Sequence, residues 1–239
     1  MGLFEDLAVR QEELAEGISE VNKVDVGALG LVAGVDTAYW TGSDGVEWGV
    51  CCVVVVDFVT HEVVQSVSAQ GRPQVPYRAG FLAFRELPLV EAAVERLTVA
   101  PEVFLFDGNG QLHERRMGIA TQASFVLNRP TVGVAKTYYR VADTGYTMPA
   151  DEVGASTSVV VDGQTLGAAV RTRKGVRPVF VSCGNWIDLD TAVAITTSLV
   201  EPTSRLPVPL RAADLATHQA RRQRCVLSPE YGAPPTVLS

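Results

Sequence analysis

The sequence predicts an α/β fold: a mixed sheet, made of an antiparallel three-stranded meander plus parallel strands, flanked by helices. Two observations lead to this prediction. Three β-like runs, over residues 29–39, 46–58 and 62–70, follow one another with only short turns between them. After them, β-like runs alternate with segments of helical periodicity, which is typical of strands joined by helices that pack on a sheet.

An amphipathic segment precedes the meander. Over residues 3–23, apolar side chains recur at helical spacing among Glu, Gln and Arg, so we expect one helix that lies on the main domain. In the second strand of the meander, residues 50–56 are continuously apolar. Such a run predicts a strand that is covered on both faces.

The second half of the chain continues the α/β pattern. Residues 79–98 have helical periodicity, with Pro88 inside the pattern. We expect residues 1–227 to form a single domain and residues 228–239, rich in Pro and Gly, to form a C-terminal tail. The remaining predicted elements are strands at 103–107, 131–135, 157–161, 167–171 and 178–182, and helices near 115–128, 188–200 and 211–224.

Composition and charge narrow the function classes. Apolar residues make up 47% of the chain and charged residues 20%, which indicates a folded globular protein. The net charge of −7 argues against a protein that coats nucleic acid through bulk electrostatics, although basic clusters such as Arg115–Arg116 leave room for a local groove. The cysteines have no C-x-x-C spacing. The first residues are acidic and contain no apolar core of signal-peptide length, and no run of ~18 uncharged apolar residues occurs in the sequence. We therefore expect a cytoplasmic protein that does not contact membranes.

Two acids follow apolar β-like runs that lie far apart in the sequence. Asp36 comes after residues 29–35 and Asp107 after residues 103–106, so we expect each strand to end in a carboxylate. A buried acid is costly unless it is paired, hydrogen-bonded or bound to a metal. The alternative is that each Asp caps a turn, because Asp-Thr and Asp-Gly both suit chain reversal.

Two further acids lie on predicted helices. Glu86 follows apolar Leu82 by one helical turn, and Asp214 lies in the first turn of the last helix. Taken alone, Glu86 would most often be a solvated helix charge, and Asp214 would most often be an acid that interacts favourably with the helix dipole. Together with the two strand acids, they supply the oxygen ligands that a magnesium-type site needs. Phosphodiester hydrolysis is a natural use of such a site.

Several other residues are candidates for a role in the chemistry. Lys136 ends a buried strand and must reach solvent or an acid, and it is not a P-loop lysine because Ala135 stands where that motif has Gly. The glycines after Asp107, Gly108 and Gly110, suit a turn or the close approach of a flat ligand such as a base. His113, one of three histidines, is either an ordinary polar contact or a catalytic group.

Four segments together resemble the successive motifs of endonuclease V, in the family's order and spacing. They are residues 33–36, 76–86, 106–118 and 132–136, and the resemblance spans roughly residues 5–225. It implies a ribonuclease H-like fold and a metal-dependent nuclease of DNA repair that recognises inosine or deoxyinosine. Family members cut the second phosphodiester bond on the 3′ side of the lesion, leaving a 3′-hydroxyl and a 5′-phosphate.

The resemblance also implies roles for individual residues. Asp36 and Asp107 would hold the catalytic Mg²⁺, for which Mn²⁺ could substitute, and Glu86 and Asp214 would place a second ion or its waters. Lys136 and His113 would steady the scissile phosphate, the attacking water or the leaving group. Tyr77 would fill the gap left by the flipped base. The residues that would line the base pocket are Gly80, Leu82, Gly108, Gly110 and Gly133.

Three positions depart from the family pattern. Glu114 stands where Pro is common, and Asn109 and Asn185 stand where many bacterial relatives have His. Glu114 and Asn185 motivate an alternative, a catalytically weak protein that binds inosine-containing strands. Asn109 also occurs in eukaryotic relatives that favour RNA, which motivates an inosine-specific endoribonuclease. Another alternative is a ribonuclease H-like nuclease that needs no modified base. We expect a monomer that acts on inosine-containing nucleic acid, DNA rather than RNA.

Overall fold

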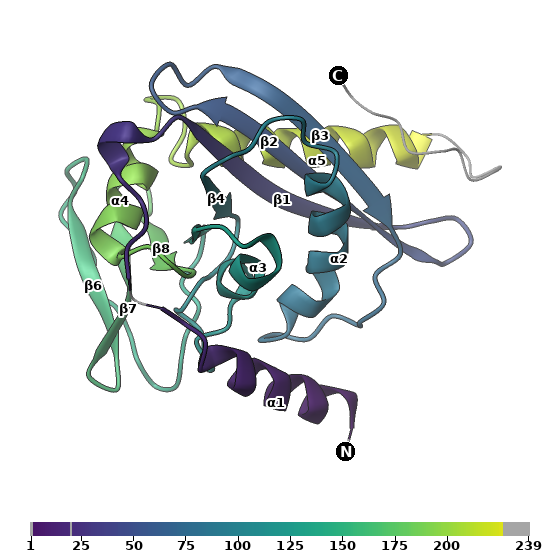
Figure 1. Cartoon of the computed structure of the whole chain (residues 1–239), viewed down its shortest axis with the longest axis horizontal. Helices are drawn as coiled ribbons and strands as arrows, with labels where there is room; N and C mark the ends of the chain where they lie inside the picture. Colours follow the sequence, from purple (N-terminus) through teal and green to yellow (C-terminus); the bar gives the residue numbers. More distant parts are fainter. Residues whose placement is uncertain (1, 20, 227–239) are drawn as a thin grey trace.

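One eight-stranded sheet forms the centre of the molecule (Figure 1). The computed structural model describes residues 2–19 and 21–226, so the predicted tail, 228–239, lies outside the described residues. The strand order is β3-β2-β1-β4-β5-β8-β7-β6. The mixed sheet predicted from the sequence is thereby confirmed.

The first three strands form the predicted antiparallel meander. They are β1 (Leu31–Thr41), β2 (Glu47–Asp57) and β3 (Val63–Gly71). Strands β4 (Val103–Phe106) and β5 (Thr131–Ala135) extend the sheet in parallel, β4 beside β1 and β5 beside β4. The parallel part of the sheet is therefore β1-β4-β5.

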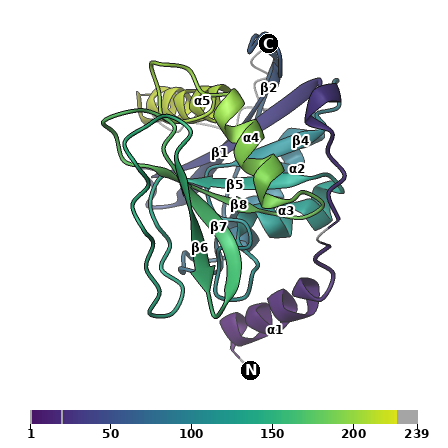
Figure 2. The ribbon, with the colours of Figure 1, turned by 90° about the vertical axis from the view of Figure 1, so that its left-hand side faces the viewer.

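The last three strands complete the sheet in antiparallel pairs. Strand β8 (Val179–Cys183) pairs with β5, and β7 (Gln164–Val170) pairs with both β8 and β6 (Ser156–Val161). Figure 2 shows β6 and β7 as a hairpin at this end of the sheet. All eight predicted strands are present, with ends that differ by a few residues from the predicted ones.

Helices cover both faces of the sheet. Alternate residues of a strand face opposite sides, so Ala33 and Val35 pack in one apolar cluster with α2 (Leu82–Val94) and α3 (Ile119–Leu127). Val32 belongs to the cluster on the other face, together with residues of α4 (Leu189–Ser198) and α5 (Val208–Val226). The sheet is therefore the middle of three layers.

The first helix is shorter than predicted. Helix α1 covers Leu3–Ala15, not residues 3–23, and a 3-10 turn, η1 (Val26–Ala28), precedes β1. The chain leaves the helix because Gly17 N–H bonds back to the Leu14 carbonyl at 3.0 Å and Ser19 N–H donates to the Asn185 side chain at 2.8 Å. These bonds draw the following residues toward the end of β8.

The prediction that Asp36 ends a strand is wrong. Strand β1 continues to Thr41 because β2 pairs with it along its whole length, up to Thr41 opposite Glu47. The parallel partner β4, in contrast, pairs with β1 only as far as Val35 opposite Phe106. Asp36 therefore lies within β1, but at the point where its parallel neighbour has ended.

Helix α2 begins at Leu82 rather than 79, and α3 begins at Ile119 rather than 115. The loop before α3 carries the segment from Asp107 to Gly118. Within the described residues, no helix combines the length and the apolar character needed to cross a membrane.

Candidate metal centre and substrate surface

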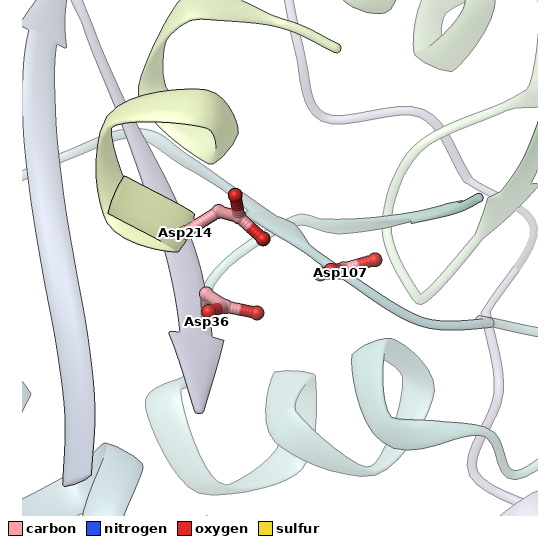
Figure 3. A group of neighbouring side chains, drawn as sticks. All are labelled: Asp36, Asp107 and Asp214. Atoms are coloured by element: carbon pink, nitrogen blue, oxygen red, sulfur yellow. The ribbon is translucent and has the colours of Figure 1, made fainter. Parts of the chain in front are cut away.

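Three aspartates from distant parts of the chain lie close together where α5 packs on β1. Asp36, Asp107 and Asp214 each offer a carboxylate oxygen, and these atoms all lie within 4.8 Å of one another (Figure 3). Hard divalent cations prefer carboxylate oxygens as ligands. Carboxylates this close to one another also repel, and a bound cation would neutralise their charge. The described part of the chain thus contains a donor set that fits a metal ion.

The parallel pairing of β1 with β4 places the first two acids. Asp107 N–H donates to the Val35 carbonyl at 3.2 Å, one residue before Asp36. This hydrogen bond continues the β1–β4 ladder by one step as β4 ends. Asp107, just after the carboxyl end of β4, therefore lies beside Asp36, which is still within β1.

Helix α5 brings the third acid because Gly34 lets it approach closely. A Cβ at Gly34 would lie 2.2 Å from the carbonyl carbon of Pro209, so the first turn of α5 rests directly on the β1 backbone. Gly34 and Asp36 point to the same face of the sheet, two residues apart. One turn further along α5, Asp214 therefore reaches the Asp36 carboxylate.

Thr217 also belongs to the site, although the sequence prediction missed it. Its buried Oγ1 donates to Asp36 Oδ2 at 2.6 Å and lies 2.9 Å from the Asp214 carbonyl. Asp214 and Thr217 are three residues apart and so share a face of α5. The spacing of three residues from Asp214 is the sequence feature from which Thr217 could have been predicted. His218 also lies near, with Nε2 3.8 Å from Asp214 Oδ1.

The environment of Asp36 disfavours its negative charge. Burial raises the pKa of this carboxyl to about 6; the hydrogen bond from Thr217 opposes the rise, and the neighbouring Asp107 charge adds to it. A divalent cation would favour the ionised form instead. The site is therefore built so that a bound cation relieves charge repulsion.

Lys136 lies at the edge of this acidic group. Its Nζ is 2.5 Å from Asp107 Oδ2 and 2.8 Å from Asp214 Oδ1. Burial lowers the pKa of Lys136, but these two contacts outweigh burial and raise the pKa to about 12. Of the two predicted partners of this strand-ending lysine, solvent or an acid, the structure shows two acids, and the ammonium stays protonated at neutral pH.

Glu86 stands apart from the three aspartates. It lies on α2, on the opposite face of the sheet from α5, and only 8% of it is exposed. Burial raises its pKa to about 8, and the nearby charges of Asp36 and Asp107 add to the rise. Glu86 is therefore electrostatically linked to the centre without belonging to the group of mutually close carboxylates.

His113 is held by the loop around Gly80 rather than by an acid. Its Nδ1 accepts the Arg115 N–H at 3.2 Å, so Nε2 carries the hydrogen that bonds to the Gly80 carbonyl at 3.1 Å. The ring stacks on Tyr139 at 5.6 Å between centroids. Burial lowers the pKa of His113 to about 4, with the Arg115 charge contributing. The imidazole is therefore neutral at physiological pH.

The segment that precedes α2 exposes an aromatic ring. Tyr77 is 71% exposed, which is high for a large aromatic residue. Gly80 has φ +82°, a left-handed conformation that favours glycine, and Leu82 is the first residue of α2. Gly80 thus lies in a turn over residues 78–81, closed by the bond from Phe81 N–H to the Arg78 carbonyl at 3.1 Å, and Tyr77 and Leu82 flank this turn.

Three further glycines of the predicted base pocket permit close backbone packing. A Cβ at Gly110 would lie 2.1 Å from the Cys183 carbonyl oxygen, and one at Gly133 would lie 2.4 Å from Gly110 N. A Cβ at Gly108 would lie 2.7 Å from the Ile119 side chain. The loop after Asp107 therefore lies flat against β5, β8 and the start of α3.

Two residues that depart from the family pattern have local partners. The fully buried Asn185 accepts N–H groups of Ser19 and Trp186 at 2.8 and 3.0 Å. Glu114 pairs with Arg115 at 2.6 Å. Asn185 thus ties the N-terminal segment to the end of β8, and the charge of Glu114 is compensated.

Comparisons with known proteins agree with this site. The family model described as Endonuclease V matches residues 12–215. An Endonuclease V of Bacillus thuringiensis is 47% identical over 221 residues, covering 92% of this chain and 94% of the relative. An Endonuclease V of Bacillus subtilis is 52% identical over 194 residues, 81% of each chain.

Solved structures show the same architecture. The crystal structure of Endonuclease_V from Bacillus subtilis superposes with a TM-score of 0.90 at 48% identity, covering 93% of this chain and 94% of that one. Ciona intestinalis Endonuclease V, crystallised with DNA that contains an inosine, has a TM-score of 0.81 at 25% identity and covers 92% and 98%.

A more distant likeness concerns the fold alone. Aquifex aeolicus Argonaute has a TM-score of 0.52 at 14% identity, over 92% of this chain and 30% of that one. It agrees with the ribonuclease H-like fold predicted from the sequence. The matched model, the identities and the acidic group together confirm the sequence prediction: the chain belongs to the endonuclease V family and is a metal-dependent phosphodiester hydrolase.

Proposed function

We propose that this enzyme cleaves nucleic acid at inosine or deoxyinosine, hydrolysing the second phosphodiester bond on the 3′ side of the modified base. The observation that carries the proposal is the group of Asp36, Asp107 and Asp214, whose oxygens lie within 4.8 Å of one another in a chain of this family. The inosine-containing DNA crystallised with the Ciona intestinalis relative supports the choice of substrate.

Mg²⁺ is the proposed ion, with Mn²⁺ as a substitute, because hard cations prefer carboxylate oxygens. Asp36 and Asp107 would hold it, and Asp214, which lies equally close, would join them or help place a second ion. When bound, such an ion activates water and stabilises the leaving oxygen. Glu86, buried behind the group, would bind waters of the metal or a second ion.

Lys136 would act on the phosphate. Its ammonium lies 2.5 Å from Asp107 and 2.8 Å from Asp214, so it would stabilise the negative charge that develops on a phosphate bound at these acids. His113 would help to steady the scissile phosphate, the attacking water or the leaving group. Its bond to the Gly80 carbonyl supports an additional role in holding the loop that would line the base pocket.

The exposed ring of Tyr77 would fill the gap that a flipped base leaves in the stack. Gly80, Leu82 and the loop glycines would then receive the base, and their backbone groups would read the hypoxanthine edge. Extruding a poorly paired base costs less than extruding a paired one, so a mispaired inosine is favoured. The compensated Glu114 and the structural Asn185 speak against a protein that binds without cutting.

The test is cleavage of labelled oligonucleotides with and without one inosine, as single-stranded DNA, duplex DNA and RNA, in Mg²⁺ and in EDTA. The proposal expects metal-dependent cutting one nucleotide beyond inosine, with DNA preferred. Equal cutting of unmodified strands would indicate a nuclease that needs no modified base, and preferential cutting of RNA an endoribonuclease. Binding without cutting would indicate the weak-binder alternative.

Three further proposals concern the oligomeric state, the domain organisation and the location of the protein. We propose a monomer, a single domain over residues 1–227, and a cytoplasmic location. Light scattering on the purified full chain would test the first, since a dimer would double the mass of 25.6 kDa. Limited proteolysis would test the second, because one domain should yield one resistant core.

A further inference from the structure

Helix α1 buries a polar residue where an apolar one is usual. Within α1, all of whose residues are described, Gln11 is the one buried residue, with 0% exposure. Gln11 lies four residues after Leu7 and three before Leu14, on the helix face that would normally carry apolar side chains. A buried amide gains little from leaving water, so its value depends on its hydrogen bonds.

The Gln11 amide binds three other segments of the chain. Its Nε2 lies 3.1 Å from the Gly80 carbonyl and 3.3 Å from the Met117 carbonyl, with Gln122 Oε1 more distant at 3.5 Å. Its Oε1 accepts from Arg115 Nε at 2.7 Å. One side chain thus joins the turn before α2, the residue before the N-cap of α3, and the arginine that follows Glu114.

The Gly80 carbonyl is the point where these bonds meet. Besides Gln11, it accepts from His113 Nε2 at 3.1 Å and from Arg115 Nη2 at 3.3 Å. Gly80 has φ +82° and no side chain, so its own backbone has more conformational freedom than that of other residues. Three donors on one carbonyl oxygen restrict that freedom from outside.

Aromatic contacts attach the same turn to α1. The rings of Phe4 and Phe81 lie 5.1 Å apart, and the Arg78 guanidinium lies 4.6 Å above the Phe4 ring. Figure 1 shows α1 at the edge of the molecule, apart from the helices that cover the sheet. Phe4 and Gln11 of α1 thus both contact the turn of residues 78–81, and Gln11 also contacts Arg115 and Met117 in the loop before α3.

We propose that Gln11 is a positioning residue for substrate recognition: through the Gly80 carbonyl, α1 fixes the turn of residues 78–81, which lies between Tyr77 and Leu82, in the conformation that accepts the base. This inference rests on the proposed function. It separates recognition from chemistry, because the hydrogen bonds of the Gln11 side chain go to Gly80, Met117, Gln122 and Arg115 and not to the three aspartates. Loss of Gln11 should therefore impair substrate capture and leave the chemical step nearly intact.

The experiment compares Gln11→Leu, Gln11→Glu and the control Glu12→Gln on DNA with one deoxyinosine. Leu removes all four contacts at similar volume, and Glu keeps an acceptor for Arg115 but loses the donors to the carbonyls. Glu12 is exposed on the same helix. We expect KM to rise about tenfold for both Gln11 variants, equivalent to about one net hydrogen bond, with kcat changed less than about twofold. Glu12→Gln should match the wild type.

A second measurement is independent of activity. Amide hydrogen exchange of residues 77–82 should accelerate in Gln11→Leu, while exchange of β1 and β4 stays as in the wild type. Should Gln11→Leu fail to fold, Gln11→Asn, which keeps the amide on a shorter stem, takes its place in both measurements.

The outcomes are distinct. Unchanged KM and unchanged exchange in a folded variant would overturn the inference, and so would a fall in kcat at constant KM. A wild-type enzyme that ignores inosine would overturn the proposed function instead, and the exchange measurement would still decide whether Gln11 holds the turn.

Discussion

The substitution Thr217→Val tests one hydrogen bond at the metal centre. Thr and Val have nearly the same shape, so the change removes the Oγ1 that donates to Asp36 Oδ2 at 2.6 Å without opening a cavity. Thr217 is fully buried, so water does not replace the lost donor. The Asp36 carboxylate then faces the Asp107 and Asp214 charges without its anchor.

The expected magnitude follows from the kind of bond. A hydrogen bond to a charged group contributes about 1.5–3 kcal/mol, so the free energy of unfolding without added metal should fall by about that amount at pH 8. The bond lowers the pKa of Asp36, which burial raises to about 6. A contribution of this sign is present above that pKa and lost below it, so wild type and variant should converge as the pH falls through 6.

The loss should also weaken metal binding. Partners that orient a metal ligand typically change metal affinity by about 10–100-fold, so the Mg²⁺ concentration for half-maximal cleavage should rise by that factor. The assay is a Mg²⁺ titration of cleavage, with urea unfolding at pH 5 and pH 8. The control is Thr196→Val, because Thr196 is fully buried and its Oγ1 has no hydrogen-bond partner among the described residues.

Thr196→Val should leave both quantities unchanged or raise stability slightly. The reasoning would be refuted if Thr217→Val bound Mg²⁺ as tightly as the wild type. A loss of stability that is the same at pH 5 and pH 8 would also refute it, since the effect would then not depend on the Asp36 charge.

Three further predictions concern the surroundings of the centre. Tyr77→Ala should keep metal affinity but slow cleavage of duplex deoxyinosine DNA, and unchanged single-turnover rates would contradict a wedge. Gly133→Ala should lower the free energy of unfolding in urea by about 1–3 kcal/mol, because the new Cβ would lie 2.4 Å from Gly110 N, whereas Gly145→Ala, in open space, should be neutral. Since burial lowers the pKa of His113 to about 4, the folded state resists protonation. Wild type should therefore lose up to about 3 kcal/mol relative to His113→Gln as the pH falls from 6.5 to 4, and parallel pH profiles would contradict this.

The regular elements were predictable because each has its own local signal. The apolar runs predicted the eight strands, and the helical periodicity predicted the helices. Ends were less predictable, because long-range partners decide them. Asp36 illustrates this: its strand continues because β2 pairs beyond it, whereas the apolar run stops. The N-terminal helix stops early for a similar reason, since Asn185, far along the chain, binds Ser19.

The site was partly predictable from residue types. Of the four predicted acids, Asp36, Asp107 and Asp214 meet, and Lys136 reaches two of them, whereas Glu86 lies outside the close group. What the sequence did not reveal depends on tertiary contacts. Thr217 acts across 181 positions on Asp36. Gln11 likewise acts across 69 positions on Gly80.

The central claim is that the three aspartates bind the catalytic metal, and calorimetric titration of Mn²⁺ into wild type and Asp107→Asn tests it most directly. Asn keeps the size of the side chain but removes one charge, and its amide retains one oxygen. We predict saturable binding by the wild type, at least about 100-fold weaker binding by the variant, and an unchanged far-UV spectrum. Equal Mn²⁺ affinity in a folded Asp107→Asn protein would contradict the account.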